Sequence, residues 1–122
     1  MKKRPQVLQG KTIKVKTGCG SAYITINKDD DGNLFEVKIV LGKAGSCINT
    51  MLYREAILWS IICQLGATKD DLLKLVKKHW LGISCDNSEK MADGRFTSCG
   101  EMIGRIILEE LEREKEDKKA SL

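Results

Sequence analysis

The sequence predicts an α+β fold in which an antiparallel sheet of about three strands precedes about three helices in one compact domain. Up to residue 41, apolar and polar side chains alternate, as in strands with one buried face. A polar turn, KDDDGN, separates two of these runs and indicates a hairpin. From residue 46 the apolar side chains recur at helical spacing instead. The 122 residues, 42% of them hydrophobic, suffice for one core.

Three strands are expected, at residues 6–16, 23–27 and 35–41. In the last of them every second side chain is apolar, which predicts one packed face made by Phe35, Val37, Ile39 and Leu41. The intervening polar positions predict that the other face of the sheet is exposed to water.

The first helix is expected from Ser46 to Leu65. Between Ala56 and Leu65 it is apolar almost all round, so it must be buried on more than one side. In a domain this small, the second side is expected to be another subunit, and the sequence therefore predicts an oligomer.

Two capping boxes mark the later helices. Thr68 with Asp71 predicts a helix that ends near Lys78, and Ser98 with Glu101 predicts the start of the last helix. Residues 1–5 and the charged residues 114–122 are expected to be flexible tails of the single domain, which covers residues 1–122.

Composition excludes several classes of protein. No apolar stretch is long enough for a signal peptide or a membrane span, so a soluble protein of the cytoplasm is expected, without a membrane partner. The net charge of +4 arises from 21 basic and 17 acidic residues, which fits a small anionic ligand better than a long nucleic acid. The turn at residues 27–38 resembles an EF-hand loop, but Lys38 occupies the position of the bidentate glutamate and strands flank it, which disfavours calcium.

The five cysteines leave two readings open. Four of them could form a zinc site, but their spacings are long and no CxxC pair is present: Cys19, Cys47, Cys85 and Cys99. Packing at turns, with Cys63 in the core, is the favoured reading, so no metal and no cofactor are expected. No histidine or aspartate is placed by the sequence to activate a cysteine, and the single His79 is expected at the surface. We therefore expect no catalytic residues and no enzyme activity.

Four segments carry a resemblance to a known family: TGCGSAYITIN, FEVKIVLGKAGSC, LGISC and FTSCG, the last preceding the final helix. Together they resemble the TSCPD domain over residues 15–113. That domain is known as a C-terminal module of adenosylcobalamin-dependent ribonucleotide reductases and as free-standing small proteins. The chain departs from the name-giving motif, because Gly100 and Glu101 stand where the family has proline and aspartate. The role of those two residues in the reductase module is therefore in doubt here.

In size and overall pattern the chain is also similar to the phage and prophage Thoeris anti-defence sponges. These proteins bind cyclic ADP-ribose isomers made by bacterial TIR proteins. The resemblance implies binding at subunit interfaces without hydrolysis, a homodimer or hexamer, and hexamers that also hold cyclic oligonucleotides. It places the protein in the cytoplasm of a bacterial host cell. The alternative is an accessory nucleotide- or metal-binding module related to the reductase.

A cyclic ADP-ribose isomer presents a pyrophosphate, ribose hydroxyls and an adenine, so its binder needs cations, polar groups and a flat apolar surface. GKAGS leads into a helix and offers backbone N–H groups for phosphate, although a plain strand-to-helix turn explains it equally. Arginines on helices can clamp phosphate, and a tryptophan can stack on adenine. Six residues are the candidate ligand contacts: Lys43, Ser46, Arg54, Trp80, Asn87 and Arg105.

Competing structural roles exist for three of these six residues. Arg105 is four residues after Glu101 and could form an ordinary helical ion pair. Arg54 could be an exposed interruption of the apolar helix. Trp80, at the end of a helix, could pack into the core instead of holding a ligand.

Overall fold

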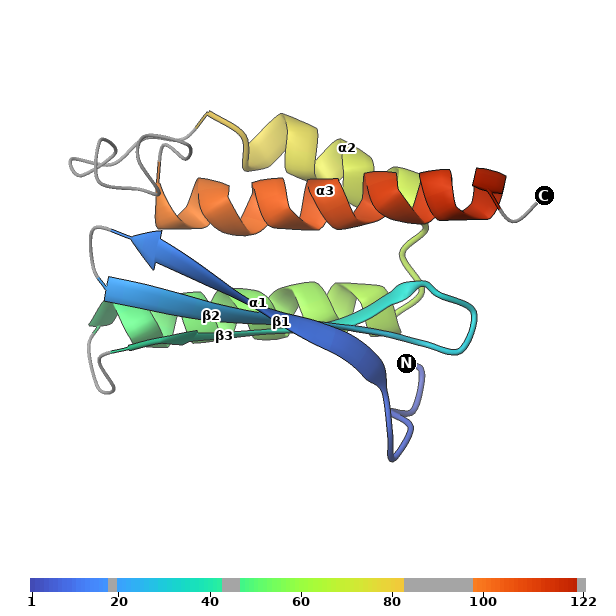
Figure 1. Ribbon diagram of the computed structural model, residues 1–122, viewed down its shortest axis with the longest axis horizontal. Helices are drawn as coiled ribbons and strands as arrows, with labels where there is room; N and C mark the ends of the chain where they lie inside the picture. Colours follow the sequence, from blue (N-terminus) through green and yellow to red (C-terminus); the bar gives the residue numbers. More distant parts are fainter. Residues whose placement is uncertain (18–19, 43–46, 83–97, 121–122) are drawn as a thin grey trace.

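The computed structural model confirms the predicted order of three antiparallel strands followed by three helices in one domain. It describes the chain except residues 18–19, 43–46, 83–97 and 121–122. In Figure 1, α2 and α3 lie together over one face of the sheet, and α1 lies beside β3, behind the sheet in this view.

The sheet has the order β1-β2-β3, with β1 at Gln9–Thr17, β2 at Gly20–Lys28 and β3 at Leu34–Leu41. Both pairs of neighbours are antiparallel. One face of the sheet is buried, and its central positions come from all three strands: Val15, Ala22, Ile24, Ile26, Val37, Ile39 and Leu41. On the opposite face, Tyr23 and Val40 are exposed. The predicted division into a packed face and a wet face is confirmed.

A shift of register between Asn27 and Lys28 changes the start of β3. Asn27 pairs with Glu36, but Lys28 pairs with Leu34, so Phe35 has no partner in this register. Leu34 consequently joins the central apolar cluster, whereas Phe35 is buried outside it. The prediction that Phe35 continues the packed face was wrong, because a bulge interrupts the alternation that period-two reasoning assumes.

The helices are α1 at Cys47–Gln64, α2 at Lys69–His79 and α3 at Cys99–Ala120. Thr68 and Asp71 form the predicted reciprocal capping box at the start of α2. At the start of α3, the Ser98 hydroxyl accepts the Glu101 N–H at 3.0 Å, which confirms the serine as the N-cap. Among the helices of the described residues, none is long and apolar enough to cross a membrane.

Helix α1 covers the outer edge of β3. The Ser60 hydroxyl accepts the Val37 N–H at 2.9 Å, and the Asn49 side-chain oxygen accepts the Leu41 N–H at the same distance. These backbone groups belong to an edge strand and would otherwise invite pairing with another chain. Two polar side chains of α1 therefore close this edge of the sheet.

One core connects the sheet with all three helices. α1 contributes Leu52, Ala56, Trp59 and Cys63, and α2 contributes Leu72 and Val76. α3 contributes a longer series that lies over the buried face of the sheet: Cys99, Met102, Ile103, Ile106, Ile107 and Leu111. Cys63 is buried, as predicted.

Much of the apolar surface of α1 stays exposed. Four of its large side chains and the residue after its end remain exposed: Met51, Tyr53, Ile57, Leu58 and Leu65. Met51, Leu58 and Leu65 recur every seven residues, the spacing with which helices pack against each other. We call these five side chains the α1 apolar face. The core of one chain leaves this face exposed, and the oligomer stays a prediction.

Contacts tie the N-terminal residues to β3 and to the end of α1. The Arg4 guanidinium forms two hydrogen bonds with the Glu36 carboxylate, at 2.8 and 3.1 Å, and Asn27 donates a third at 2.7 Å. The Lys2 N–H donates to the Gln64 carbonyl at the end of α1. Bonding from Arg4 holds the pKa of the Glu36 carboxyl below its usual value, despite opposition from burial.

Candidate functional site

Trp80, at the C-terminal end of α2, joins all three helices. Its indole N–H donates to the Glu55 carboxylate on α1. Its ring is tilted against the Trp59 ring, with the ring centroids 4.9 Å apart. Its Cβ lies so close to α3 that a Cβ added to Gly104 would be 2.5 Å away. Trp80 is therefore fixed by a polar bond, an aromatic contact and a close helix approach.

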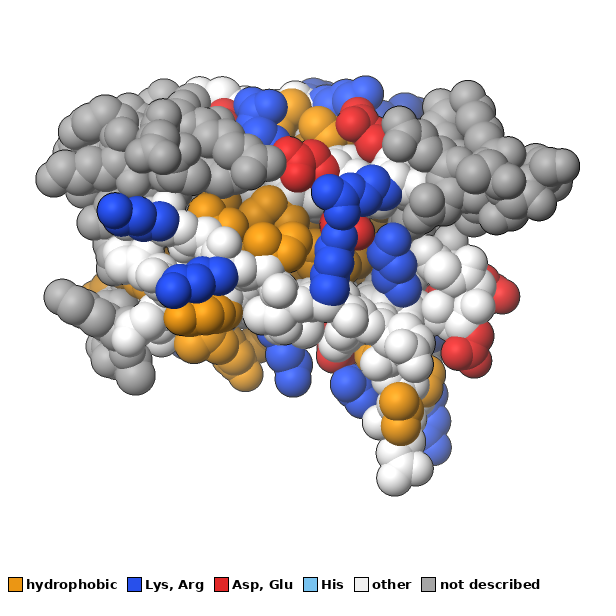
Figure 2. All heavy atoms as spheres, viewed as in Figure 1, with side chains coloured by type: hydrophobic (Ala, Val, Ile, Leu, Met, Phe, Trp, Pro, Cys, Tyr) orange, Lys and Arg blue, Asp and Glu red, His pale blue; other side chains and the backbone are white. Residues whose placement is uncertain are grey.

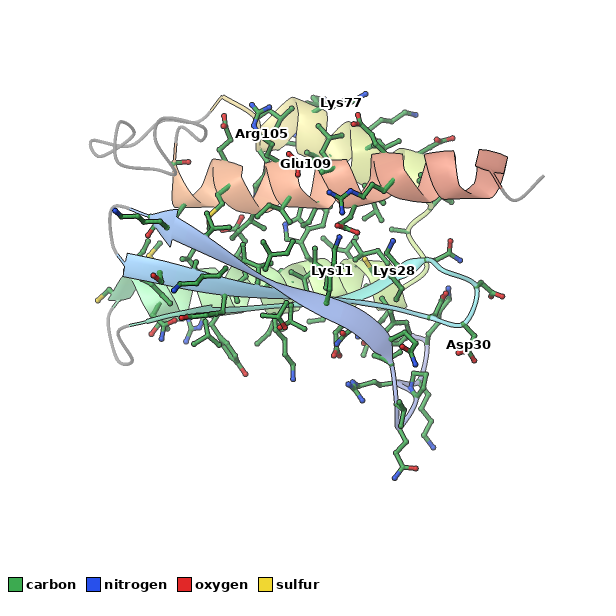
Figure 3. All side chains as sticks on the ribbon, viewed as in Figure 1. Lys11, Lys28, Asp30, Lys77, Arg105 and Glu109 are labelled. Carbon is green, nitrogen blue, oxygen red and sulfur yellow. The ribbon has the colours of Figure 1, made fainter. Side chains whose placement is uncertain are left out.

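Arg105 follows Gly104 directly and is held by the buried Glu101. The Arg105 Nε and a Glu101 carboxylate oxygen are 3.4 Å apart, and the other carboxylate oxygen accepts the Gly82 N–H. Only 1% of the Glu101 side chain is exposed, compared with 38% of the Arg105 side chain. In Figure 3, Arg105 projects from α3 on the side where α2 lies. Glu101 thus fixes both the arginine and the turn after α2.

The structure brings two of the six candidate ligand residues together. Trp80 and Arg105 belong to one cluster with Glu55, Glu101 and Gly82, which we call the Trp80–Arg105 cluster. The helical ion pair considered for Arg105 is present, and Trp80 is partly buried against Trp59. Three candidates lie outside the described residues: Lys43, Ser46 and Asn87.

Arg54 does not belong to this cluster, although it is next to Glu55 in the sequence. It is exposed on α1, three residues after Met51 and four before Leu58, and therefore interrupts the α1 apolar face. Its neighbour Glu55 points to Trp80 instead. A second chain packed on this face would place Arg54 at the contact between subunits.

Glu55 in the Trp80–Arg105 cluster has a carboxyl with a shifted pKa. Burial raises the pKa of its carboxyl, and the hydrogen bond from Trp80 lowers it by a smaller amount. A raised pKa means that the folded state favours the protonated acid. The stability this provides is present below the ordinary glutamate pKa of about 4.3 and is lost as the pH rises through the folded value.

Glu55→Gln, which stays neutral and can still accept the indole N–H, should therefore gain stability relative to the wild type as the pH rises from about 4 to about 7. Urea unfolding at several pH values measures this. Glu36→Gln is the matched control with the opposite sign, because the pKa of Glu36 is lowered and its contribution is lost as the pH falls. If the stability of Glu55→Gln relative to the wild type did not rise with pH, the raised pKa of Glu55 would be contradicted.

The described cysteines differ in their surroundings. Cys99 is buried, but Cys47, the first residue of α1, is exposed. The prediction that Cys47 packs was wrong, because a residue in the first turn of a helix can face away from the core. Cys19 and Cys85 lie outside the described residues. In the part of the chain that is described, no three histidine, cysteine or acidic side chains are placed to hold a metal.

The turn from β2 to β3 is organised by its own backbone. The Asp29 carboxylate accepts the N–H groups of Asp31 and Asn33 at 3.0 and 2.9 Å. Gly32 has a φ of 80°, which favours glycine there. Strands flank this turn on both sides, as the sequence predicted when it disfavoured an EF-hand. His79 is exposed, also as predicted.

Sequence reasoning found only part of what holds the candidates in place. Glu55 was not singled out, and Glu101 was expected to cap the last helix and to pair with Arg105, but not to be buried or to accept the Gly82 N–H. Gly104, in the middle of an otherwise good helix, carried the clearest signal, because an interior glycine usually marks a close approach. A second group of charged side chains, around Glu110 of α3, was also missed.

Comparison with known families supports one assignment. The model of the TSCPD domain matches residues 1–111, which is most of the chain and includes all strands, α1, α2 and the first part of α3. Comparisons with curated proteins and with solved structures find no match. The match extends further toward the N-terminus than the sequence resemblance did. The chain belongs to the TSCPD domain family.

Proposed function

We propose that this protein binds and sequesters a cyclic ADP-ribose isomer without hydrolysing it, and thereby inhibits Thoeris-type anti-phage defence in the cytoplasm of a bacterial host. Membership of the TSCPD domain family and the similarity in size and pattern to the Thoeris sponges support this. The observation that carries the proposal is the Trp80–Arg105 cluster, which holds an aromatic ring and a guanidinium at the meeting point of three helices.

The chemistry of the cluster suits the ligand. Glu101 engages the Nε atom of Arg105, so the terminal nitrogens of the guanidinium are available for phosphate oxygens. Holding the arginine in advance reduces the entropy lost on binding. The partly buried Trp80 supplies an apolar surface beside it. The Glu101 carboxylate competes with phosphate for the Arg105 guanidinium and so limits the affinity. The ligand can therefore dissociate again.

The proposed site is shared between subunits. The α1 apolar face carries Arg54 within a surface suited to a second copy of the chain. A homodimer, or a hexamer built from dimers, would bury this face and partly desolvate Arg54, which strengthens its bonds to a pyrophosphate. In the sponge family, the hexamer also holds cyclic oligonucleotides, and we extend that expectation to this chain.

Two substitutions test the site. Arg54→Ala should weaken calorimetric affinity for a cyclic ADP-ribose isomer by at least about tenfold, because charge-assisted bonds are lost. Arg105→Lys should do the same while keeping a cation beside the buried Glu101, since lysine cannot reproduce the planar guanidinium. Lys78→Ala, at an exposed position on α2, is the control and should bind like the wild type. Wild-type affinity in both arginine variants would show that the site lies elsewhere.

One observation favours the alternative of a metal-binding module related to the reductase. Cys47 and Cys99 are the first residues of α1 and α3, and both helices begin at the same end of the molecule in Figure 1. Elemental analysis of protein purified without chelator separates the two functions. One zinc per chain would favour the module, and a metal-free protein that binds the ligand would favour the sponge.

A further inference from the structure

The face of the sheet opposite α2 and α3 is open. Those two helices lie over the other face, and α1 lies beside β3 (Figure 1). Strand alternation and the register direct five exposed side chains to the open side: Lys14, Lys16, Tyr23, Lys38 and Val40. We call these five side chains the open sheet face. Figure 2 shows lysine and arginine side chains together with hydrophobic ones on the underside of the sheet, where this face is seen edge-on.

The positive charges of the open sheet face are not balanced. None of its three lysines forms an ion pair with a residue that the structure describes. Among the side chains that the described strands direct to this side, Glu36 is the only acid, and Arg4 and Asn27 already hold its carboxylate. Bonding from Arg4 is the main cause of the lowered pKa of Glu36, and Lys38 contributes least. Because Arg4 and Glu36 cancel each other, three positive charges remain in excess.

Tyr23 lies at the centre of the open sheet face. In the register it stands between Lys14 of β1 and Val40 of β3. Tyr23 is 42% exposed, and the Lys14 Nζ is 5.9 Å from the centroid of its ring. Two residues further along β2, the Thr25 hydroxyl lies 2.9 Å from the Thr12 hydroxyl, so polar groups continue beside the ring. An exposed aromatic ring next to a cation on a sheet is an arrangement that stacks a nucleic acid base and binds its phosphate.

Ordinary solvation does not account for this composition. Polar side chains are usual on the wet face of a sheet, but the chain has 17 acidic residues for 21 basic ones, so an average wet face would carry both signs. The open sheet face instead carries one sign, together with the exposed Tyr23 and Val40. The nearly balanced charge of the whole chain, which disfavoured a long nucleic acid, therefore does not extend to this surface.

We propose that the open sheet face binds single-stranded nucleic acid without strong sequence preference, at a site separate from the Trp80–Arg105 cluster. Lys14, Lys16 and Lys38 bind phosphates, and the Tyr23 ring stacks on a base. A single strand fits better than a duplex, because only an unpaired base offers its ring to an aromatic side chain. An acidic protein surface would use the lysines alone and would gain nothing from stacking on Tyr23.

Fluorescence anisotropy of the full chain with labelled oligothymidylate and oligouridylate, at several salt concentrations, tests this site. Both strands should bind at low salt, since neither phosphate contacts nor stacking need the 2′-hydroxyl. The slope of log K against log salt should be about −2, from about −0.7 for each of three phosphate contacts. Lys14→Gln and Lys38→Gln should each reduce its magnitude by about 0.7. Lys77→Gln is the matched control, because it removes the same charge from an exposed position on α2, on the other side of the sheet (Figure 3). It should leave affinity and slope unchanged.

Tyr23→Leu separates base stacking from attraction between charges. It keeps an apolar side chain beside Val40 and removes no charge, so it should weaken binding by about fivefold or more and leave the salt slope unchanged. Wild-type affinity in Tyr23→Leu, or competition by polyglutamate or duplex DNA as effective as that by a single strand, would overturn the proposal and indicate a general polyanion surface. Equal losses in Lys14→Gln and Lys77→Gln, or no binding by the wild type at low salt, would overturn it as well.

Discussion

Gly104→Ala is expected to destabilise the protein by about 1–3 kcal/mol, the usual cost of overpacking. The added Cβ would be 2.5 Å from the Cβ of Trp80 and 3.0 Å from its Cγ, closer than packed carbons approach. Trp80 cannot move away freely, because its indole is bonded to Glu55 and packed on Trp59. The cost should exceed the roughly 1 kcal/mol that alanine gains over glycine inside a helix. Denaturant unfolding measures the difference.

Gly100→Ala is the control on the same helix. Among the residues that the structure describes, a Cβ at Gly100 would meet only the Ser98 hydroxyl oxygen, at 3.9 Å, which is an ordinary contact. This variant should therefore be as stable as the wild type or gain up to about 1 kcal/mol from helix propensity. Equal stabilities for Gly104→Ala and Gly100→Ala would show that Trp80 does not approach α3 as closely as described.

Leu58→Asp is expected to convert the proposed oligomer to a monomer. Leu58 lies at the centre of the α1 apolar face and is 59% exposed in the single chain. In a two-fold symmetric interface each substitution acts twice, and burying a leucine contributes about 1.5–3 kcal/mol. The dimer affinity should therefore fall by at least about 100-fold. Sedimentation or light scattering at micromolar concentration gives the mass of the wild type and of the variant.

Val40→Asp is the matched control for this change. Val40 is 53% exposed, close to the value for Leu58, but it lies on the open face of the sheet and not on α1. The variant should keep the mass of the wild type. A wild-type monomer would remove the basis for a site between subunits, and a monomer produced by Val40→Asp alone would move the interface to the sheet.

The sequence predicted the fold well where one local pattern decides the structure. Alternation placed Val37, Ile39 and Leu41 of β3 on the packed face, and the Thr68–Asp71 box marked the start of α2. It failed at Phe35, because a bulge depends on the pairing of two strands and leaves no mark in either strand alone. The exposure of the α1 apolar face followed from helical spacing together with the small size of the domain.

The candidate sites were less accessible to sequence reasoning, because they depend on contacts between distant segments. Trp80 and Arg105 were chosen for their chemistry, but their proximity arises from Gly104 and Glu101, which bring α2 onto α3. The group of charged side chains around Glu110 was missed altogether. Its signal was Lys11, a charge at a position where strand alternation calls for an apolar side chain.

Titration of the wild-type protein with a cyclic ADP-ribose isomer, followed by recovery of the ligand, tests the proposed function most directly. Calorimetry should show saturable, tight binding, and heating the complex should release the same isomer, because the protein is proposed to bind without bond cleavage. Chromatography with mass detection distinguishes the cyclic isomer from linear ADP-ribose, which is heavier by one water. Recovery of the intact isomer after tight binding is the predicted result. Absence of binding, or release of linear ADP-ribose, would contradict sequestration.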